Sequence, residues 1–118
     1  MQSSYKWIIE SYTNQDKKYT VVFNNSGKLT CSCPDWIYRH KEDEYYQCKH
    51  IRDIVQYCLY EFAYIMIKTH NIPINEVVNR LYPTGATNEI KLKLLDSVFK
   101  MALEKNIQEK VENKLNSL

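Results

Sequence analysis

Two short motifs of cysteine and histidine in the first half of the chain constrain its fold more than any other feature. Cys31 and Cys33 form a Cys-x-Cys motif, and Cys48 and His50 form a Cys-x-His motif after an intervening segment, residues 34–47. Each motif offers two ligands to one metal ion, and Zn²⁺ favours four thiolate and imidazole ligands in a closed tetrahedron. The spacing therefore predicts one structural Zn²⁺ bound by these four residues.

Other uses of the cysteines fit the sequence less well. Four cysteines allow two disulfides, but Cys31 and Cys33 are too close in sequence to pair easily with each other. The N-terminus has neither the apolar run nor the cleavage site of a secretory signal, and no long uncharged apolar stretch follows. We therefore expect an intracellular protein, cytoplasmic or nuclear/nucleoid, with no membrane partner.

Length and composition indicate a small folded protein. The chain has 118 residues, of which 44% are hydrophobic and 25% charged, as is typical of globular domains. We expect a zinc-binding domain over residues 1–70, followed by a helical extension over residues 71–118. This extension either packs on the first part or mediates dimerisation.

The first third of the chain has the pattern of a β-meander. Residues 5–12 and 19–23 are rich in aromatic and β-branched side chains, and a polar stretch separates them. A turn that contains Gly27 precedes a third short strand, residues 28–31. Residues 35–47 have no sustained period, which predicts a loop with or without one helical turn.

Helical periodicity dominates the rest of the sequence. Apolar residues recur at helical spacing over residues 49–68, which predicts one long central helix. A short helix is predicted over residues 75–81, between breaks at Pro73 and at residues 83–85. A last helix, capped by Thr87 or Asn88 and running from residue 89 to near the end, carries an apolar stripe: Leu95, Phe99, Ala102, Leu103, Ile107, Val111, Leu115 and Leu118. The predicted fold class is α+β: a small antiparallel β-meander with a zinc knuckle, then a long central helix and C-terminal helices.

Residues 19–57 resemble a SWIM zinc finger, whose pattern is Cys-x-Cys, a variable spacer and Cys-x-His between strands and a helix. The chain has the alternating apolar strand, the glycine turn, the run Thr-Cys-Ser-Cys-Pro-Asp-Trp and the run Cys-Lys-His-Ile. The resemblance implies the same four ligands, with Pro34, Asp35 and Trp36 as the turn after the first motif. The spacer is longer and more charged than is usual for the family.

Several residues near the motifs have two interpretations. Cys58 lies on the apolar stripe of the central helix, which favours a buried core residue over a fifth ligand. His40 lies in a charged segment, which favours a solvated side chain. An aromatic group near Arg39 and Lys41 could stack on bases or cover the zinc core; it comprises Trp36, Tyr38, Tyr45 and Tyr46.

No catalytic constellation is present in the sequence. It has no Ser/His/Asp set, no phosphate-binding glycine loop, and only two glycines. A closed four-ligand zinc site also leaves no position for a reactive water. We therefore expect a binding protein and not an enzyme.

The sequence is consistent with two functions. The SWIM resemblance implies a small DNA-associated protein, acting in recombination, transposition or transcription. Its candidate nucleic-acid-binding residues are the cations of the first half: Lys17, Lys18, Lys28, Arg39, Lys41, Lys49 and Arg52. The alternative is an interaction adaptor in which zinc is purely structural and the helices bind a protein partner, such as a recombinase-like ATPase, or a second copy. The formal net charge of +2, about +1 with Zn²⁺ and three thiolates, does not by itself indicate nucleic acid.

Overall fold

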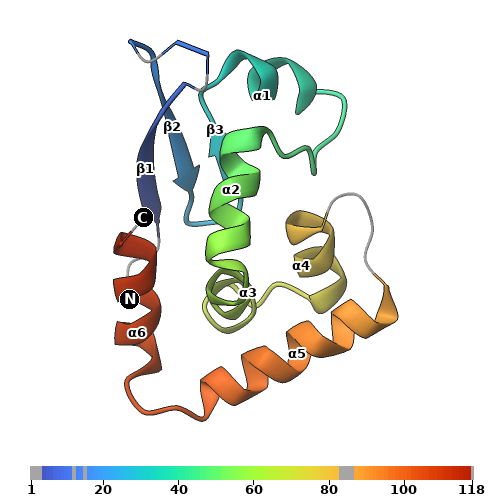
Figure 1. Cartoon of the computed structure of the whole chain (residues 1–118). Helices are drawn as coiled ribbons and strands as arrows, with labels where there is room; N and C mark the ends of the chain where they lie inside the picture. The colour runs from blue at the N-terminus through green and yellow to red at the C-terminus, as the bar shows by residue number, and fades with distance from the viewer. Residues whose placement is uncertain (1–3, 12, 15, 83–86, 118) are drawn as a thin grey trace.

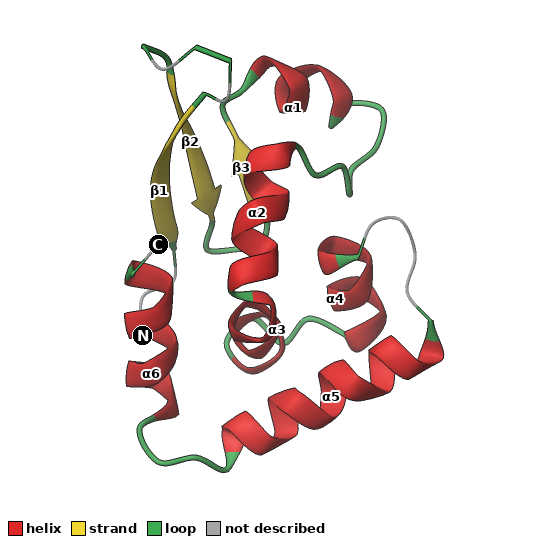
Figure 2. Cartoon of the chain, viewed as in Figure 1, coloured by secondary structure: helices red, strands yellow, loops and turns green. Residues whose placement is uncertain are grey.

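A computed structural model of this chain describes residues 4–11, 13–14, 16–82 and 87–117. The described residues form a three-stranded antiparallel sheet followed by six helices, which confirms the predicted α+β class (Figure 1, Figure 2). Tyr12, the predicted break at residues 83–85 and Leu118 lie outside the described residues.

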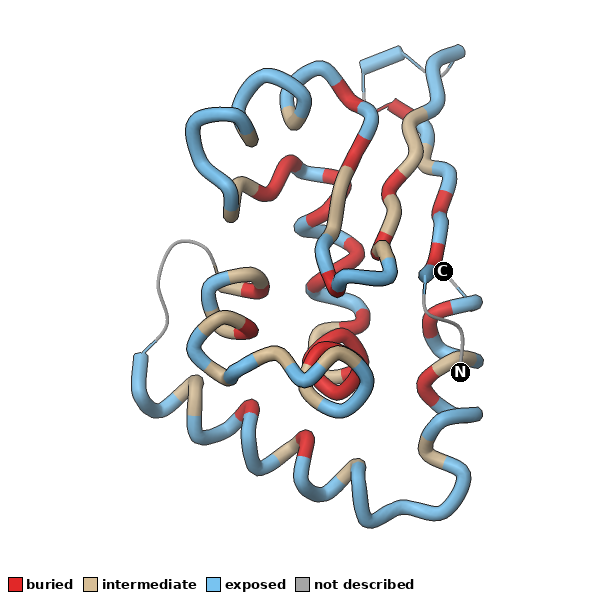
Figure 3. Tube along the Cα trace, turned by 180° about the vertical axis from the view of Figure 1, so that it is seen from behind, coloured by how far each residue is buried: buried red, intermediate tan, exposed pale blue. Residues whose placement is uncertain are grey.

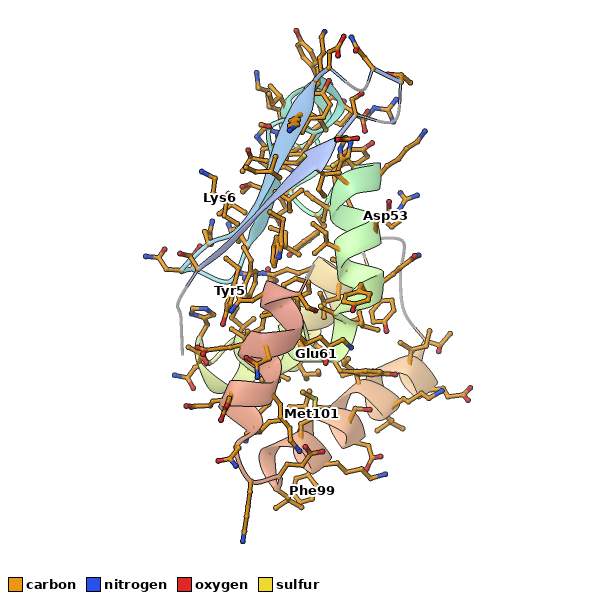
Figure 4. All side chains as sticks on the ribbon, turned by 60° about the vertical axis from the view of Figure 1, so that its left-hand side comes forward. Tyr5, Lys6, Asp53, Glu61, Phe99 and Met101 are labelled. Atoms are coloured by element: carbon orange, nitrogen blue, oxygen red, sulfur yellow. The ribbon has the colours of Figure 1, made fainter. Side chains whose placement is uncertain are left out.

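The sheet is a meander of β1 (Tyr5–Glu10), β2 (Lys18–Phe23) and β3 (Leu29–Cys31), in that spatial order. Tyr5 lies opposite Phe23 and Trp7 opposite Val21, and these four side chains are buried on the face that meets the helices. Alternation along β1 turns Lys6 to the other face, away from the helices (Figure 4). The sheet therefore contributes one apolar face to the core.

The segment predicted as a loop after the first motif contains a short helix, α1 (Pro34–Arg39). Its start is encoded locally, because Pro34 occupies the first turn, where no backbone donor is needed. The Sγ of Cys33 accepts a hydrogen bond from the backbone N–H of Trp36 and so caps the helix. The prediction for residues 35–47 allowed one helical turn, and α1 provides it over residues 35–39.

The predicted central helix is two helices, α2 (Lys49–Tyr57) and α3 (Leu59–Lys68). They are separated at Cys58, whose φ of −122° and ψ of 34° are not helical. The change of direction at this point turns α3 across the end of α2 (Figure 1). As a result α3 lies in the middle of the molecule, where Phe62, Ile65 and Met66 are completely buried.

Three further helices surround α3: α4 (Ile74–Leu81), α5 (Asn88–Ala102) and α6 (Ile107–Asn116). The predicted last helix is divided because Asn106 adopts a left-handed conformation, φ 58°, which asparagine tolerates better than most residues. The chain reverses there, and α6 returns to the sheet. The indole Nε1 of Trp7 donates to the carbonyl oxygen of Leu115 over 2.8 Å.

The predicted apolar stripe is only partly correct. Val111 and Leu115 of α6 are buried, as the stripe requires. On α5, however, the buried residues are Leu94 and Val98, and the outer side of this helix is exposed (Figure 3). Exposed apolar side chains there include Phe99, which points away from the core (Figure 4). Among the described helices, none combines the length and apolar character needed to cross a bilayer.

Candidate metal centre

The four predicted ligands come from three elements that meet at one end of the sheet. Cys31 is the last residue of β3, Cys33 precedes α1, Cys48 precedes α2, and His50 lies in the first turn of α2. All four are buried, and their potential ligand atoms lie within 4.8 Å of one another. The fold therefore brings both motifs together, as their spacing predicts.

Distances between these atoms suit a tetrahedral zinc site. The Nδ1 atom of His50 lies 3.7 Å from the Sγ of Cys31 and 3.8 Å from the Sγ of Cys48. Bond lengths of about 2.3 Å for Zn–S and 2.0–2.1 Å for Zn–N imply S···N separations of about 3.5 Å in a tetrahedron. The observed separations need only a small contraction to reach these values.

The chemistry of the donor set also favours a cation. A hydrogen bond with Cys31 lowers the pKa of Cys48 to about 5, and the same bond, together with burial, raises the pKa of Cys31 far above its usual range. Burial raises the pKa of Cys33 as well. Three buried sulfurs thus compete for negative charge, and a bound dication would stabilise all three as thiolates.

Contacts with β2 hold the first motif in shape. The backbone N–H of Ser32 donates to the carbonyl oxygen of Thr20 over 3.0 Å, and the N–H of Thr20 donates to the Oγ of Ser32 over 2.8 Å. These two hydrogen bonds fix Ser32 against β2, whereas Cys31 and Cys33 on either side of it in sequence are buried. On the second motif, the Tyr19 ring packs 5.3 Å from the His50 ring, centroid to centroid.

Cys58 is not part of this centre. It is completely buried in the core and lies outside the four-residue cluster. Burial, with a smaller effect of Glu61, raises the pKa of its thiol to about 11, so it stays protonated at neutral pH. The prediction that it is a core residue is confirmed.

Three of the predicted nucleic-acid-binding cations gather beside the metal centre. Arg39, Lys49 and Arg52 line an open hollow of about 430 Å³, which we call the basic hollow; Cys33, Cys48 and His50 also line it. Lys17 is close to its edge, because its carbonyl oxygen accepts a hydrogen bond from the N–H of Ser11, another lining residue.

The remaining three candidates are placed differently. Lys18 lies opposite Glu10 in the sheet, next to Lys17. Lys41 is exposed in the loop after α1. Lys28 lines a different cavity, described next, so the structure does not bring the whole predicted set together.

A second cavity, of about 220 Å³, is also lined by residues of α1, and we call it the aromatic cavity. Trp36, Tyr45 and Tyr46 line it, whereas Tyr38 is not among the lining residues and is 73% exposed. His40 also lines it and stacks on Trp36, with ring centroids 3.8 Å apart and an interplanar angle of 3°. His40 was predicted to be solvated; instead α1 places residues four apart on one face, where the two rings meet.

Sequence reasoning missed the contacts that shape this cavity. The hydroxyl of Tyr45 donates to Glu76 Oε2 over 2.9 Å, and the Nε2 of Gln47 donates to the carbonyl oxygen of Arg80 over 2.9 Å. Both bonds join the loop after α1 to α4. No local pattern signals such contacts, because the partners are about thirty residues apart in sequence.

Comparison with known proteins agrees with this geometry. The family model of the SWIM zinc finger matches residues 19–58, a stretch that begins in β2 and ends at Cys58. No curated protein and no solved structure matches the chain. The matched stretch contains all four clustered ligands. Residues 19–58 of this protein are therefore a SWIM zinc finger domain with a Cys₃His site for one Zn²⁺.

Proposed function

We propose that this protein is a DNA-associated zinc module that binds nucleic-acid phosphates through its basic hollow. The observation that carries the proposal is the convergence of Arg39, Lys49 and Arg52 on one open surface beside the metal centre. Lys17 and Lys18 extend the positive charge along the neighbouring end of the sheet. Phosphate contacts of this kind supply affinity that does not depend on base sequence.

Local acids reduce this positive field but do not cancel it. Asp35, which also lines the basic hollow, pairs with Arg39 over 3.1 Å. Lys49 and Arg52 follow Cys48 closely, at the start of α2, where the helix dipole adds to their charge. Zinc supports this surface structurally, because its four ligands join β3 to α1 and α2, the two helices that carry the cations. The closed ligand set also favours a binding role over catalysis.

A salt titration of DNA binding tests the proposal. We expect the zinc-loaded protein to bind labelled duplex DNA at low ionic strength, with log Kd rising linearly with log salt concentration. Replacing two phosphate-binding cations in a Lys49→Gln/Arg52→Gln double variant should reduce that slope by about 2. Fluorescence anisotropy at a series of salt concentrations gives both values.

The matched control is a Lys68→Gln/Lys105→Gln double variant, which removes the same charge from exposed residues away from the basic hollow. It should bind DNA with the wild-type slope. Absence of salt-dependent binding at low ionic strength would sink the proposal, and so would equal losses in the two double variants.

A second function, self-association as an adaptor, is supported by the outer side of α5. Its apolar stripe consists of Leu92, Leu95, Phe99 and Leu103, which are 66%, 37%, 64% and 72% exposed. Single exposed apolar residues are ordinary, but an aligned set on one helix face is typical of an interaction surface. Half of the large exposed apolar side chains among the described residues belong to this stripe.

Charges beside the stripe favour a second copy as the partner. Four residues along one flank alternate in sign: Glu89, Lys93, Asp96 and Lys100. When an identical helix packs in the antiparallel direction, the reversed order places opposite charges against each other. The proposed assembly is therefore an antiparallel dimer through α5.

Sedimentation analysis over a range of concentrations tests this assembly. We expect wild-type protein to dimerise and Phe99→Ser to remain monomeric. Ile8→Ser is the control, because Ile8 is 68% exposed on the sheet and lies outside the stripe. A wild-type protein that is monomeric at every concentration would contradict the proposal.

A further inference from the structure

The aromatic cavity has the size and lining of a site for one planar ring. Leu29, Ile51 and Met66 provide apolar surface, and Trp36 and Tyr46 provide aromatic surface. Its volume of about 220 Å³ is below the roughly 300–1,000 Å³ of pockets that enclose a whole drug-sized ligand. It therefore suits one ring group that projects from a larger molecule.

The free edge of β3 adds hydrogen-bonding groups to this cavity. Lys28 and Ser32 form hydrogen bonds with the β2 side of the sheet. The N–H of Asn24 donates to the carbonyl oxygen of Lys28, and the N–H of Ser32 donates to the carbonyl oxygen of Thr20. Alternate residues of an antiparallel strand direct their backbone groups to opposite sides, so Leu29 directs its N–H and C=O away from β2. A donor and an acceptor side by side complement the edge of a nucleobase, which also carries both.

The aromatic cavity and the basic hollow are adjacent and share part of their lining. One face of α1 gives Trp36 and His40 to the cavity, and the adjacent face gives Arg39 to the hollow. Tyr46 and Gln47 line both. The guanidinium carbon of Arg39 lies 5.7 Å from the centroid of the Tyr46 ring, so a phosphate bound there would be adjacent to the cavity.

We infer that the aromatic cavity binds one unpaired nucleobase of a DNA strand whose phosphate lies in the basic hollow. This inference rests on the proposed DNA-binding function and adds to it a preference for single strands over duplexes. A base in a duplex is stacked and paired, and it would have to leave the helix to enter the cavity. An unpaired base can enter directly and stack on the aromatic wall.

The test compares three labelled probes by fluorescence anisotropy with the zinc-loaded full chain: an oligo-dT strand, a duplex of equal length, and a strand of abasic sites. We expect the oligo-dT strand to bind about tenfold more tightly than the other two probes, because the stacking of one base on an aromatic side chain increases affinity by about that factor. A Glu44→Trp variant should lose this preference, because Glu44 is an exposed lining residue and an indole there covers the cavity.

The matched control is Glu42→Trp, which makes the same change of charge and size in the same loop at an exposed residue that does not line the cavity. It should keep the wild-type preference. Retention of the preference by both variants would overturn the inference, because the base would then bind elsewhere.

The remaining outcomes separate this inference from the function on which it rests. Salt-dependent binding of equal strength to all three probes would overturn the base site and leave the phosphate-binding proposal intact. No salt-dependent binding to any probe would overturn both.

Discussion

Gly27 is a residue whose identity is set by its surroundings. Its φ of +76° is unfavourable for residues with a Cβ, and an added Cβ would lie 2.7 Å from the Cδ1 atom of Ile72. The carbonyl oxygen of Gly27 accepts a hydrogen bond of 2.8 Å from Arg80 Nη1. Arg80 in turn pairs with Glu76 over 3.1 Å, so this turn anchors α4 to the sheet.

Gly27→Ala should destabilise the protein by about 1–3 kcal/mol, from the left-handed conformation and the displacement of Ile72. Equilibrium urea unfolding measures this difference in the free energy of unfolding. Asn25→Ala, at an exposed position of the same turn, should change it by less than about 0.5 kcal/mol. Equal stability of the two variants would show that the turn tolerates a side chain.

Among the elements, α5 shows why periodicity alone cannot orient a helix. Leu94 and Val98 form one apolar face, and Leu95 and Phe99 belong to another, each at helical spacing. The two faces are indistinguishable in sequence, because both satisfy the same period. Only packing against α3 selects the first.

The contrast between buried and exposed apolar positions predicts different effects on stability for two leucines of the predicted stripe. Leu115 of α6 is completely buried and Leu103 is 72% exposed. Leu115→Ala should reduce the free energy of unfolding by about 2–5 kcal/mol, and Leu103→Ala by less than about 0.5 kcal/mol. Thermal unfolding of both variants checks the prediction, which fails if the exposed leucine costs as much as the buried one.

Features that depend on local spacing could be predicted from the sequence, whereas features that depend on long-range packing could not. The three strands, the four ligands and the core position of Cys58 follow from local spacing and were correct. The breaks at Cys58 and Asn106 depend on how α3 and α6 meet the rest of the chain, and were not foreseen. The hydrogen bond from Tyr45 to Glu76, which shapes the aromatic cavity, joins residues distant in sequence and has no local signal.

At the scale of the molecule, the zinc finger and the C-terminal helices share one core. The buried side chains form a single cluster that extends from Tyr5 and Trp7 of β1 to Leu115 of α6. Lys114 of α6 pairs over 2.9 Å with Glu61 of α3, and this hydrogen bond raises the pKa of Lys114. The helices after residue 58 are thus packed against the finger and not tethered beside it.

Removal of zinc should therefore loosen the whole chain in one transition. Structural zinc sites contribute about 10–16 kcal/mol in small finger peptides, more than the usual stability of a domain. After addition of a chelator, far-UV circular dichroism and the fluorescence of the two tryptophans, Trp7 and Trp36, should change together. Loss of the fluorescence signal with full retention of helix would mean that the helices fold independently of the finger.

The central claim is that Cys31, Cys33, Cys48 and His50 bind one structural Zn²⁺. Elemental mass spectrometry of protein purified without added zinc tests it directly, with Cys48→Ala and Cys58→Ala as a matched pair. We expect one zinc per chain in the wild type and in Cys58→Ala, which should lose about 1 kcal/mol of stability. Cys48→Ala should lose both the zinc and its cooperative thermal transition. A metal-free wild type that is as stable as the zinc-loaded protein, or a Cys48→Ala variant that retains its metal, would contradict the account.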